Sequence, residues 1–156
     1  NLKEILIPEG YYTIAIDALI KAQNSNNNIT KDSLIFPILF CFRHYLEIIM
    51  KDTIRKFKIA NNEITPEQIG YDKEHSLLTI WNQLKKYIQH TQTVECQTFE
   101  KLINEINRID NKSFSFRYAY VGTNNNEEYI NPIFKNEIDI DLDNLKSVMG
   151  TIKYFV

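Results

Sequence analysis

The chain of 156 residues has the length of one domain, and its contents of 44% apolar and 24% charged residues are close to globular averages. Its net charge of −2 provides no overall basic field for binding nucleic acid. Its two cysteines are too few for a disulfide-rich secreted scaffold. Because Cys41 and Cys96 also lack the spacing of metal ligands, we expect two thiols in a reducing, cytoplasmic compartment.

No apolar run reaches the length of a membrane span. The longest one, Leu34–Phe42, is too short and is ended by Arg43 and His44. Residues 1–10 lack the apolar core and the cleavage site of a signal peptide. We therefore expect no membrane partner. The start at Asn1 predicts that residues 1–156 form a single domain of a longer chain.

Two helices are predicted in the first 60 residues. Residues 1–8 are expected to form an irregular lead-in, and a first helix is predicted from Tyr11 to about Gln23 by the helical spacing of its apolar residues. After a polar loop, Thr30 or Asp32 is predicted to cap the second helix. That helix is apolar on all faces, so we expect it to be central and surrounded by the others.

Two further helices are predicted from about residue 76 to 90 and from about 95 to 109, each with an apolar stripe on one side. From Ser113 to Val121, aromatic residues alternate with small or polar ones, which indicates a strand. Turn residues follow, and Tyr129–Phe134 is predicted to return as a second short strand.

A last helix is predicted after residue 139. Asp139 or Asp141 is expected to cap it, and Gly150 inside it is expected to mark a close approach of another helix. The predicted fold class is therefore mainly α: a four- or five-helix bundle around a central apolar helix, with a small β-hairpin-like insertion before the last helix.

A group of charged and polar residues interrupts the apolar second helix. Arg43 and Glu47 are neighbours at i, i+4, His44 lies between them in sequence, and Lys51 extends the same edge. Charges on such a helix are costly unless they are paired or face a wet cleft. Two interpretations stay open: an internal ion pair that fixes the helix register, or a site where Arg43 holds a phosphate and His44 exchanges a proton.

Two other segments offer residues of the same kinds. His75 precedes the third helix, either as a helix-cap residue or as a second imidazole near Arg43. Arg117 lies among aromatic residues, either as an exposed charge or folded back into the same cleft with Tyr118 beside it. The predicted composite site has as its catalytic residues Arg43, His44, His75 and Arg117, and as its binding residues Glu47, Lys51 and Tyr118.

No motif indicates a metal or another cofactor. The chain has no Gly-rich phosphate loop, no HExxH, no EF-hand loop and no GxSxG. It has three histidines, so a site with several histidine ligands would be sparse. We expect no metal site and no cofactor.

Four short stretches resemble, in this order, a bacterial group of HEPN-like helical proteins. They are Phe42–Glu47 with its Arg-His-Tyr-Leu-Glu core, the helix start His75–Trp81, the Phe-Arg-Tyr segment at 116–118, and the last helix from Asp141 to Ile152. The resemblance implies a small helical bundle that is often dimeric. Many members are metal-independent ribonucleases of toxin–antitoxin or phage-defence systems, and others are non-catalytic binding modules.

The resemblance implies that a histidine moves a proton at the ribose or the leaving oxygen, while an arginine stabilises the phosphate charge. The hallmark of the family is an arginine followed, after four to six residues, by a histidine. This chain departs from it, since Arg43 directly precedes His44 and since Arg55, Arg108 and Arg117 have no histidine downstream in that range.

Two functional hypotheses follow. The first is a metal-independent RNA endonuclease or toxin-type effector in bacterial defence or toxin–antitoxin systems, with RNA, a second copy of the chain and an antitoxin or other protein as its partners. The alternative is a non-catalytic helical binding or dimerisation module in which Arg43 and Glu47 form a buried structural pair. The missing hallmark and the mild acidity of the chain favour the alternative.

Overall fold

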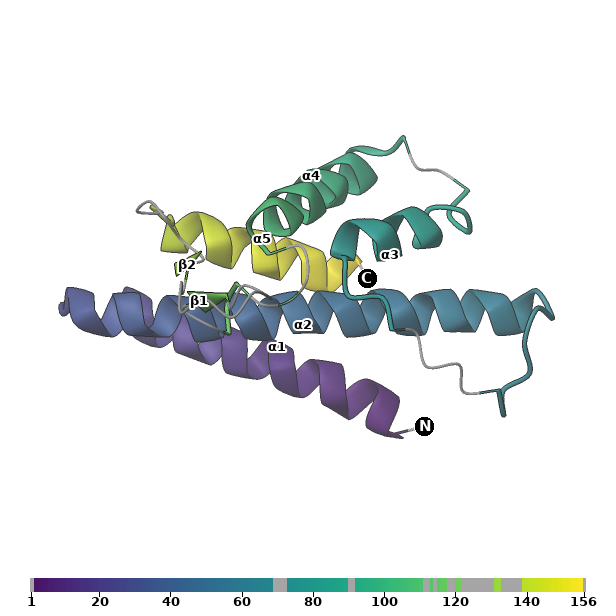
Figure 1. Ribbon diagram of the computed structural model, residues 1–156, viewed down its shortest axis with the longest axis horizontal. Helices are drawn as coiled ribbons and strands as arrows, with labels where there is room; N and C mark the ends of the chain where they lie inside the picture. The colour runs from purple at the N-terminus through teal and green to yellow at the C-terminus, as the bar shows by residue number, and fades with distance from the viewer. Residues whose placement is uncertain are drawn as a thin grey trace.

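The computed structural model describes residues 2–68, 73–89, 92–110, 113, 115–117, 120–121, 131–132 and 139–155. The described part is mainly α, which confirms the prediction of a helical bundle. Figure 1 shows its elements, which are α1 (Leu2–Gln23), α2 (Asn28–Ala60), α3 (Leu77–Leu84), α4 (Val94–Ile109), β1 (Tyr120–Val121), β2 (Asn131–Pro132) and α5 (Leu142–Phe155).

Helix α1 begins at Leu2, so the predicted irregular lead-in was wrong. Pro8 lies inside the helix although it lacks the N–H that would bond to the carbonyl four residues earlier. It is buried with the other residues of one face, so packing against a neighbouring helix outweighs the local cost. The residues of that buried face are Pro8, Tyr12, Ala15, Leu19 and Ala22.

Helix α2 begins one residue after its N-cap, Asn27, whose side-chain oxygen accepts a hydrogen bond from the backbone N–H of Ile29 at 2.9 Å. The predicted caps Thr30 and Asp32 already lie inside the helix. An asparagine at this position satisfies one of the backbone N–H groups that the first turn leaves without a helical partner.

Helix α2 is central only in part. It runs beside α1, in the most extensive helix–helix contact of the described residues, and its other side packs against α3 (Figure 1). Its first third is open to solvent, since Ile29 is 77% and Phe36 is 42% exposed. The section from Ile38 to Ile54 contains all of its buried residues.

Helices α3 and α4 pack against each other, and Trp81 of α3 contacts Phe99 of α4 with ring centroids 4.9 Å apart. Ser76 caps α3 through a bond from the N–H of Thr79. Helix α3 ends at Leu84, earlier than predicted. The backbone N–H groups of Lys86, Tyr87 and Ile88 each donate to the carbonyl three residues earlier, which is the pattern of a 3₁₀ turn and not of an α-helix.

The predicted β-hairpin is not supported. Residues 115–117 form a turn, and strand pairing in the described part is limited to two residues on each side, Tyr120 with Pro132 and Val121 with Asn131. The backbone N–H of Ser115 donates to Asp110 Oδ1 at 3.0 Å, so a side chain takes the bond that a strand partner would have made. Most of the predicted second strand, Tyr129–Phe134, lies outside the described residues.

Helix α5 packs against α1 and buries Met149 and Ile152. Its start matches one of the two predicted caps: Asp141 Oδ1 accepts the N–H groups of Asp143 at 2.9 Å and Asn144 at 3.0 Å. Within the described part of the chain, the expected close approach at Gly150 is absent, because a Cβ built there would meet none of its atoms within 4 Å.

Helix α2 is long and apolar enough to cross a membrane by length and composition. The sequence prediction missed this because it counted only the uninterrupted run before Arg43. A core helix of a water-soluble bundle meets the same criterion, so length and composition do not assign a location.

We predict that Asp141→Ala lowers the free energy of unfolding by about 1 kcal/mol, because the first turn of α5 then loses its side-chain acceptor. Chemical denaturation with urea measures this change. Asp139→Ala, which removes an exposed carboxylate two residues before the cap, is the matched control and should change the stability by less than about 0.5 kcal/mol. Equal effects of the two substitutions would contradict the assignment of the cap.

Candidate functional site

Arg43 lies in the middle of α2, and its side chain has no exposed surface. Its Nη1 donates to Glu47 Oε2 at 3.0 Å. Its Nε donates to the backbone oxygen of Asp110 at 3.3 Å and lies 3.4 Å from Asp110 Oδ2. Its Nη2 donates to the backbone oxygen of His75. One guanidinium therefore ties α2 to the residue before the cap of α3 and to the residue that ends α4.

Glu47 is the second centre of this group, and only 5% of its side chain is exposed. Besides Arg43, it accepts hydrogen bonds through Oε1 from Lys51 Nζ and from His75 Nδ1, each at 2.9 Å. Burial alone would raise the pKa of Glu47, but the hydrogen bonds from Lys51, His75 and Arg43 together outweigh it and hold the pKa below its ordinary value. Glu47 is therefore a carboxylate at neutral pH.

We call Arg43, Glu47, Lys51, His75 and Asp110 the buried charge cluster, although two of these residues are partly exposed at the surface of the protein. The His75 side chain is 55% exposed and the Lys51 side chain 21%. Arg43 and Lys51 carry two positive charges against the two negative charges of Glu47 and Asp110, so the cluster is balanced when His75 is neutral. This balance lowers the cost of placing four charges in or beside the core.

His44 lies apart from the cluster, on a side of α2 that faces α1. Its ring makes an edge contact with Tyr11, at 4.5 Å between centroids, and stacks on Phe40 at 5.9 Å. Burial lowers the pKa of His44, and the nearby positive charges, Arg43 foremost, lower it further against the opposing effect of Glu47. The imidazole is therefore neutral at pH 7.

Arg117 belongs with His44 rather than with Arg43. Its guanidinium carbon lies 5.8 Å from the centroid of the Phe40 ring, and its Nε donates to the backbone oxygen of Ser113 at 2.5 Å. Ser113 adopts a positive φ of 63° in the turn that holds this bond. Phe40 is thus the common neighbour of His44 and Arg117.

The structure therefore divides the predicted composite site in two. It brings together Arg43, Glu47, Lys51 and His75, and it places His44 and Arg117 around Phe40 instead. Tyr118 lies outside the described residues. Among the residues that are described, no three His, Cys, Asp or Glu side chains gather as metal ligands.

The sequence prediction missed Asp110, which is 1% exposed and completes the surroundings of Arg43. A usable signal was present, because Asp110 directly follows the apolar stripe of α4 and stands at its C-cap. A negative charge is unfavourable at that end of a helix, where the carbonyl groups are exposed. A carboxylate in that position implies a cation opposite it, and Arg43 is that cation.

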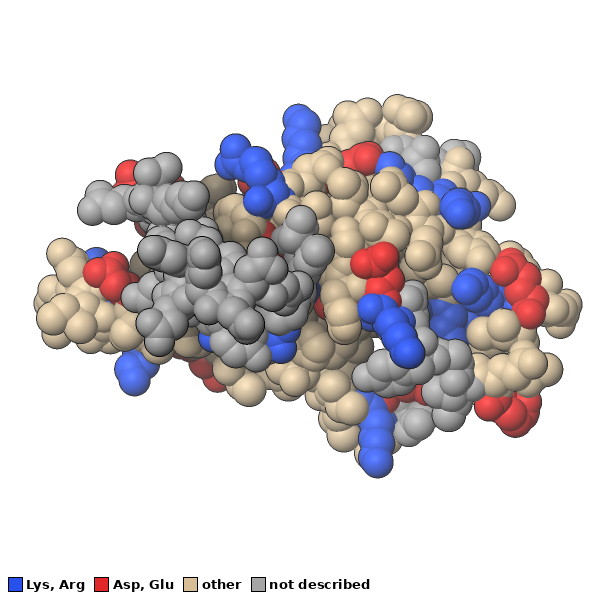
Figure 2. Space-filling view, viewed as in Figure 1, with Lys and Arg blue, Asp and Glu red and all other residues tan. Residues whose placement is uncertain are grey.

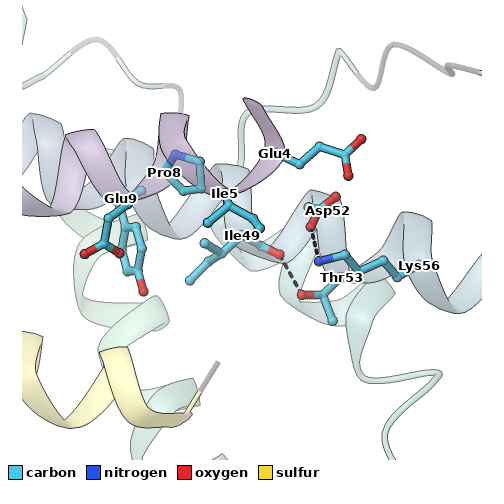
Figure 3. A pocket seen from close by; sticks show the side chains of 9 residues that line it. Glu4, Ile5, Pro8, Glu9, Ile49, Asp52, Thr53 and Lys56 are labelled. Carbon is cyan, nitrogen blue, oxygen red and sulfur yellow. Dashed lines mark hydrogen bonds and ion pairs between the residues drawn. The ribbon is translucent and has the colours of Figure 1, made fainter. Parts of the chain in front are cut away.

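A small pocket lies elsewhere, between the N-terminal part of α1 and α2, with a volume of about 180 Å³ (Figure 3). Its charged residues are paired, since Lys56 binds Asp52 at 2.6 Å and Arg55 lies 3.5 Å from Glu4. None of the predicted site residues that the structure describes lines it. Its lining residues are Glu4, Ile5, Pro8, Glu9, Tyr45, Ile49, Asp52, Thr53 and Lys56.

Comparison of the chain with protein-family models, with curated proteins and with solved structures finds no match.

We predict that Arg43→Ala lowers the free energy of unfolding by about 3–5 kcal/mol, because it leaves the buried Asp110 carboxylate without its cation and removes the buried partner of Glu47. Thermal and chemical denaturation measure the loss. Arg108→Ala, at an exposed arginine of α4, is the control and should change the stability by no more than about 0.5 kcal/mol. An Arg43→Ala protein as stable as the control would show that the buried charge cluster does not hold the fold.

The lowered pKa of Glu47 predicts an acid-sensitive fold. A carboxyl group whose pKa is lower in the folded state contributes stability above its ordinary value of 4.5, and this contribution is lost as the pH falls through the folded-state pKa. Glu47→Gln should therefore cost most at neutral pH and progressively less below about pH 4.5, as urea midpoints across pH 3–7 will show. Glu105→Gln, which removes an exposed carboxylate of α4, is the control, and a constant deficit of Glu47→Gln over this range would contradict the prediction.

Proposed function

We propose that this chain is a HEPN-like helical module that binds a protein partner and does not cleave RNA. The observation that supports this most directly is the burial of Arg43. Its guanidinium is engaged by Glu47, by Asp110 and by the backbone of His75, so a phosphate could reach it only if the core opened. The arginine that the ribonuclease hypothesis needs is a structural residue in this arrangement.

The surface charge also favours a protein partner. The chain has a net charge of −2, and on the face shown in Figure 2 basic and acidic side chains are interspersed instead of forming a field of one sign. Proteins that bind the nucleic-acid backbone use clustered lysines and arginines. Lys51, Lys56 and Lys85 instead pair with carboxylates of the same chain.

One observation favours the metal-independent ribonuclease as a second candidate. The His75 imidazole is anchored through Nδ1 by a buried carboxylate, is more than half exposed, and shares that carboxylate with Lys51. A histidine oriented in this way can transfer protons, and a neighbouring lysine can attract phosphate. In this candidate, His75 would be the acid–base residue, and Arg117 with His44 would contact RNA at a second point.

We also propose that the module is cytoplasmic. Cys41 and Cys96 are both free and buried, as is typical of proteins from a reducing compartment. The central section of α2 carries Arg43 and Glu47 in ion pairs that reach other elements of the same chain. Buried charges of this kind need partners from the rest of the protein, so the helix that carries them is poorly suited to a lipid environment.

We predict that the purified chain leaves total RNA and tRNA intact when it is incubated with a chelator and analysed on denaturing gels. The matched variants are His75→Ala and His44→Ala, which remove one imidazole from each of the two groups of predicted site residues. Cleavage by the wild-type chain that His75→Ala abolishes, in a variant with an unchanged circular-dichroism spectrum, would reject the binding module and establish the ribonuclease. Cleavage that is lost only in His44→Ala would also reject the non-catalytic binding module.

A further inference from the structure

The pocket between α1 and α2 has polar ends and an apolar middle. Figure 3 shows Glu9 toward one end, Ile5 and Ile49 between the ends, and Asp52 toward the other end. Its volume of about 180 Å³ equals that of about six water molecules, so it suits a ligand of about six non-hydrogen atoms. The shape and the lining together favour a small, elongated molecule that is polar at both ends.

Tyr45 brings an unused hydroxyl to the end near Glu9. The residue lines the pocket and is only 6% exposed. Its ring packs against Tyr12 and Phe42, but its hydroxyl makes no hydrogen bond with any residue that the structure describes. Burial first, and then the nearby negative charge of Glu9, raise the pKa of Tyr45 to about 12, so the hydroxyl is neutral. Because a buried hydroxyl ordinarily has a partner, this one points to a bound ligand.

The carboxylates at the two ends each keep one oxygen for a ligand. Glu9 binds Lys153 through Oε1 at 2.5 Å, and Asp52 binds Lys56 through Oδ2 at 2.6 Å. Their second oxygens, Glu9 Oε2 and Asp52 Oδ1, make no such bond within the described part of the chain. Beside Asp52, the Thr53 hydroxyl donates to a backbone oxygen of its own helix at 2.7 Å, so its oxygen can still accept a hydrogen bond. Both ends of the pocket therefore offer acceptors to a ligand that carries donors.

Lys56 indicates which donor suits the second end. Its ammonium lies 2.6 Å from the Asp52 carboxylate, while 64% of its side chain is exposed to water. An exposed ion pair of this kind contributes little to stability, so a ligand can displace Lys56 from the carboxylate at little cost. A primary ammonium is thus the group that Asp52 already binds.

We propose that the pocket binds a linear aliphatic diamine, with one ammonium at Glu9 and Tyr45 and the other at Asp52. Both amino groups of such a molecule are protonated at neutral pH, and its carbon chain packs against Ile5 and Ile49. Tyr45 and Asp52 are seven residues apart in α2, which corresponds to about 10 Å along the helix axis. Two ammonium–oxygen distances of about 2.8 Å leave roughly 5 Å between the nitrogen atoms, a distance that about four carbon atoms span.

The diamine site is independent of the proposed protein-binding function, because none of its residues belongs to the buried charge cluster. It adds a small-molecule ligand to a chain whose other proposed partner is a protein. The probe that matches the spacing of the two ends is 1,4-diaminobutane.

The first test is a titration of the ¹⁵N-labelled chain with 1,4-diaminobutane, followed by NMR. We expect a dissociation constant on the order of 1 mM for this ligand of six non-hydrogen atoms, with amide shifts at both Glu9 and Thr53. 1-Aminobutane lacks the second ammonium and should bind at least about fivefold more weakly, and the uncharged 1,4-butanediol should not bind. No shifts at about 10 mM diamine, or equal affinity for 1-aminobutane, would overturn the proposal.

The second test separates a ligand-binding role from a structural one. Tyr45→Phe keeps the packed ring and removes only the hydroxyl, so it should weaken diamine binding at least about threefold without lowering the melting temperature. Glu9→Gln should weaken binding at least about fivefold. Glu105→Gln removes the same charge from an exposed position of α4, and it should change the affinity by less than about twofold. Wild-type affinity in both Tyr45→Phe and Glu9→Gln would contradict the assigned end of the pocket and overturn the site.

The third test removes the internal competitor for Asp52. In Lys56→Met the carboxylate is open to the ligand, so the diamine should bind at least about twofold more tightly. Lys101→Met makes the same change of net charge at an exposed position of α4 and should leave the affinity unchanged. Equal gains in the two variants would indicate general attraction of cations to the chain and would overturn the proposal.

These outcomes are separate from those of the RNA-cleavage assay. A chain that leaves RNA intact and does not bind the diamine rejects only the diamine site. A chain that binds the diamine and cleaves RNA rejects only the non-catalytic module.

Discussion

The rest of the structure depends on the pairing of Arg43 with Glu47 and Asp110. Moving a guanidinium out of water is costly, and the cost is offset only where several acceptors surround it with good geometry. Arg43 has one such acceptor from each of three places: Glu47 in α2, the backbone of His75 just before α3, and Asp110 at the end of α4. Apolar packing would allow these helices to slide by a turn with little loss, whereas a buried charge accepts only the register in which its acceptors meet it. The cluster therefore specifies the arrangement of the helices more than it adds to their stability.

The same constraint separates buried charged groups from those that solvent can reach. Arg43 is fixed inside, while Glu47 connects the interior to the surface by holding Lys51 and His75. His44 is one residue from Arg43 in sequence but points toward Tyr11 and Phe40, because successive residues of a helix are rotated by about 100°. Residues that are adjacent in sequence therefore have different surroundings, whereas His75 combines an orientation fixed by Glu47 with a side chain that is 55% exposed.

The sequence was sufficient for the elements that depend on local patterns. The apolar stripe of α4, the cap at Asp141 and the i, i+4 pair of Arg43 and Glu47 each follow from spacing within one helix. The sequence was insufficient where contacts with distant segments determine the local conformation. Pro8 indicated a break, yet burial against α2 keeps α1 helical, and the aromatic alternation after Ser113 indicated a strand, yet Asp110 draws that segment into a turn. Asp110 itself was missed because its partner lies 67 residues away in the chain.

The separation of Arg43 and Asp110 along the chain has a consequence for how the protein folds. The α1–α2 hairpin needs only a short loop, whereas the contact with Asp110 requires closure of a long one, so the hairpin is expected to form first. At that stage Arg43 and Glu47 can pair within α2 while still in water, and their desolvation waits until α3 and α4 dock. The contact between Arg43 and Asp110 therefore stabilises the folded protein late in folding, after α1 and α2 have come together.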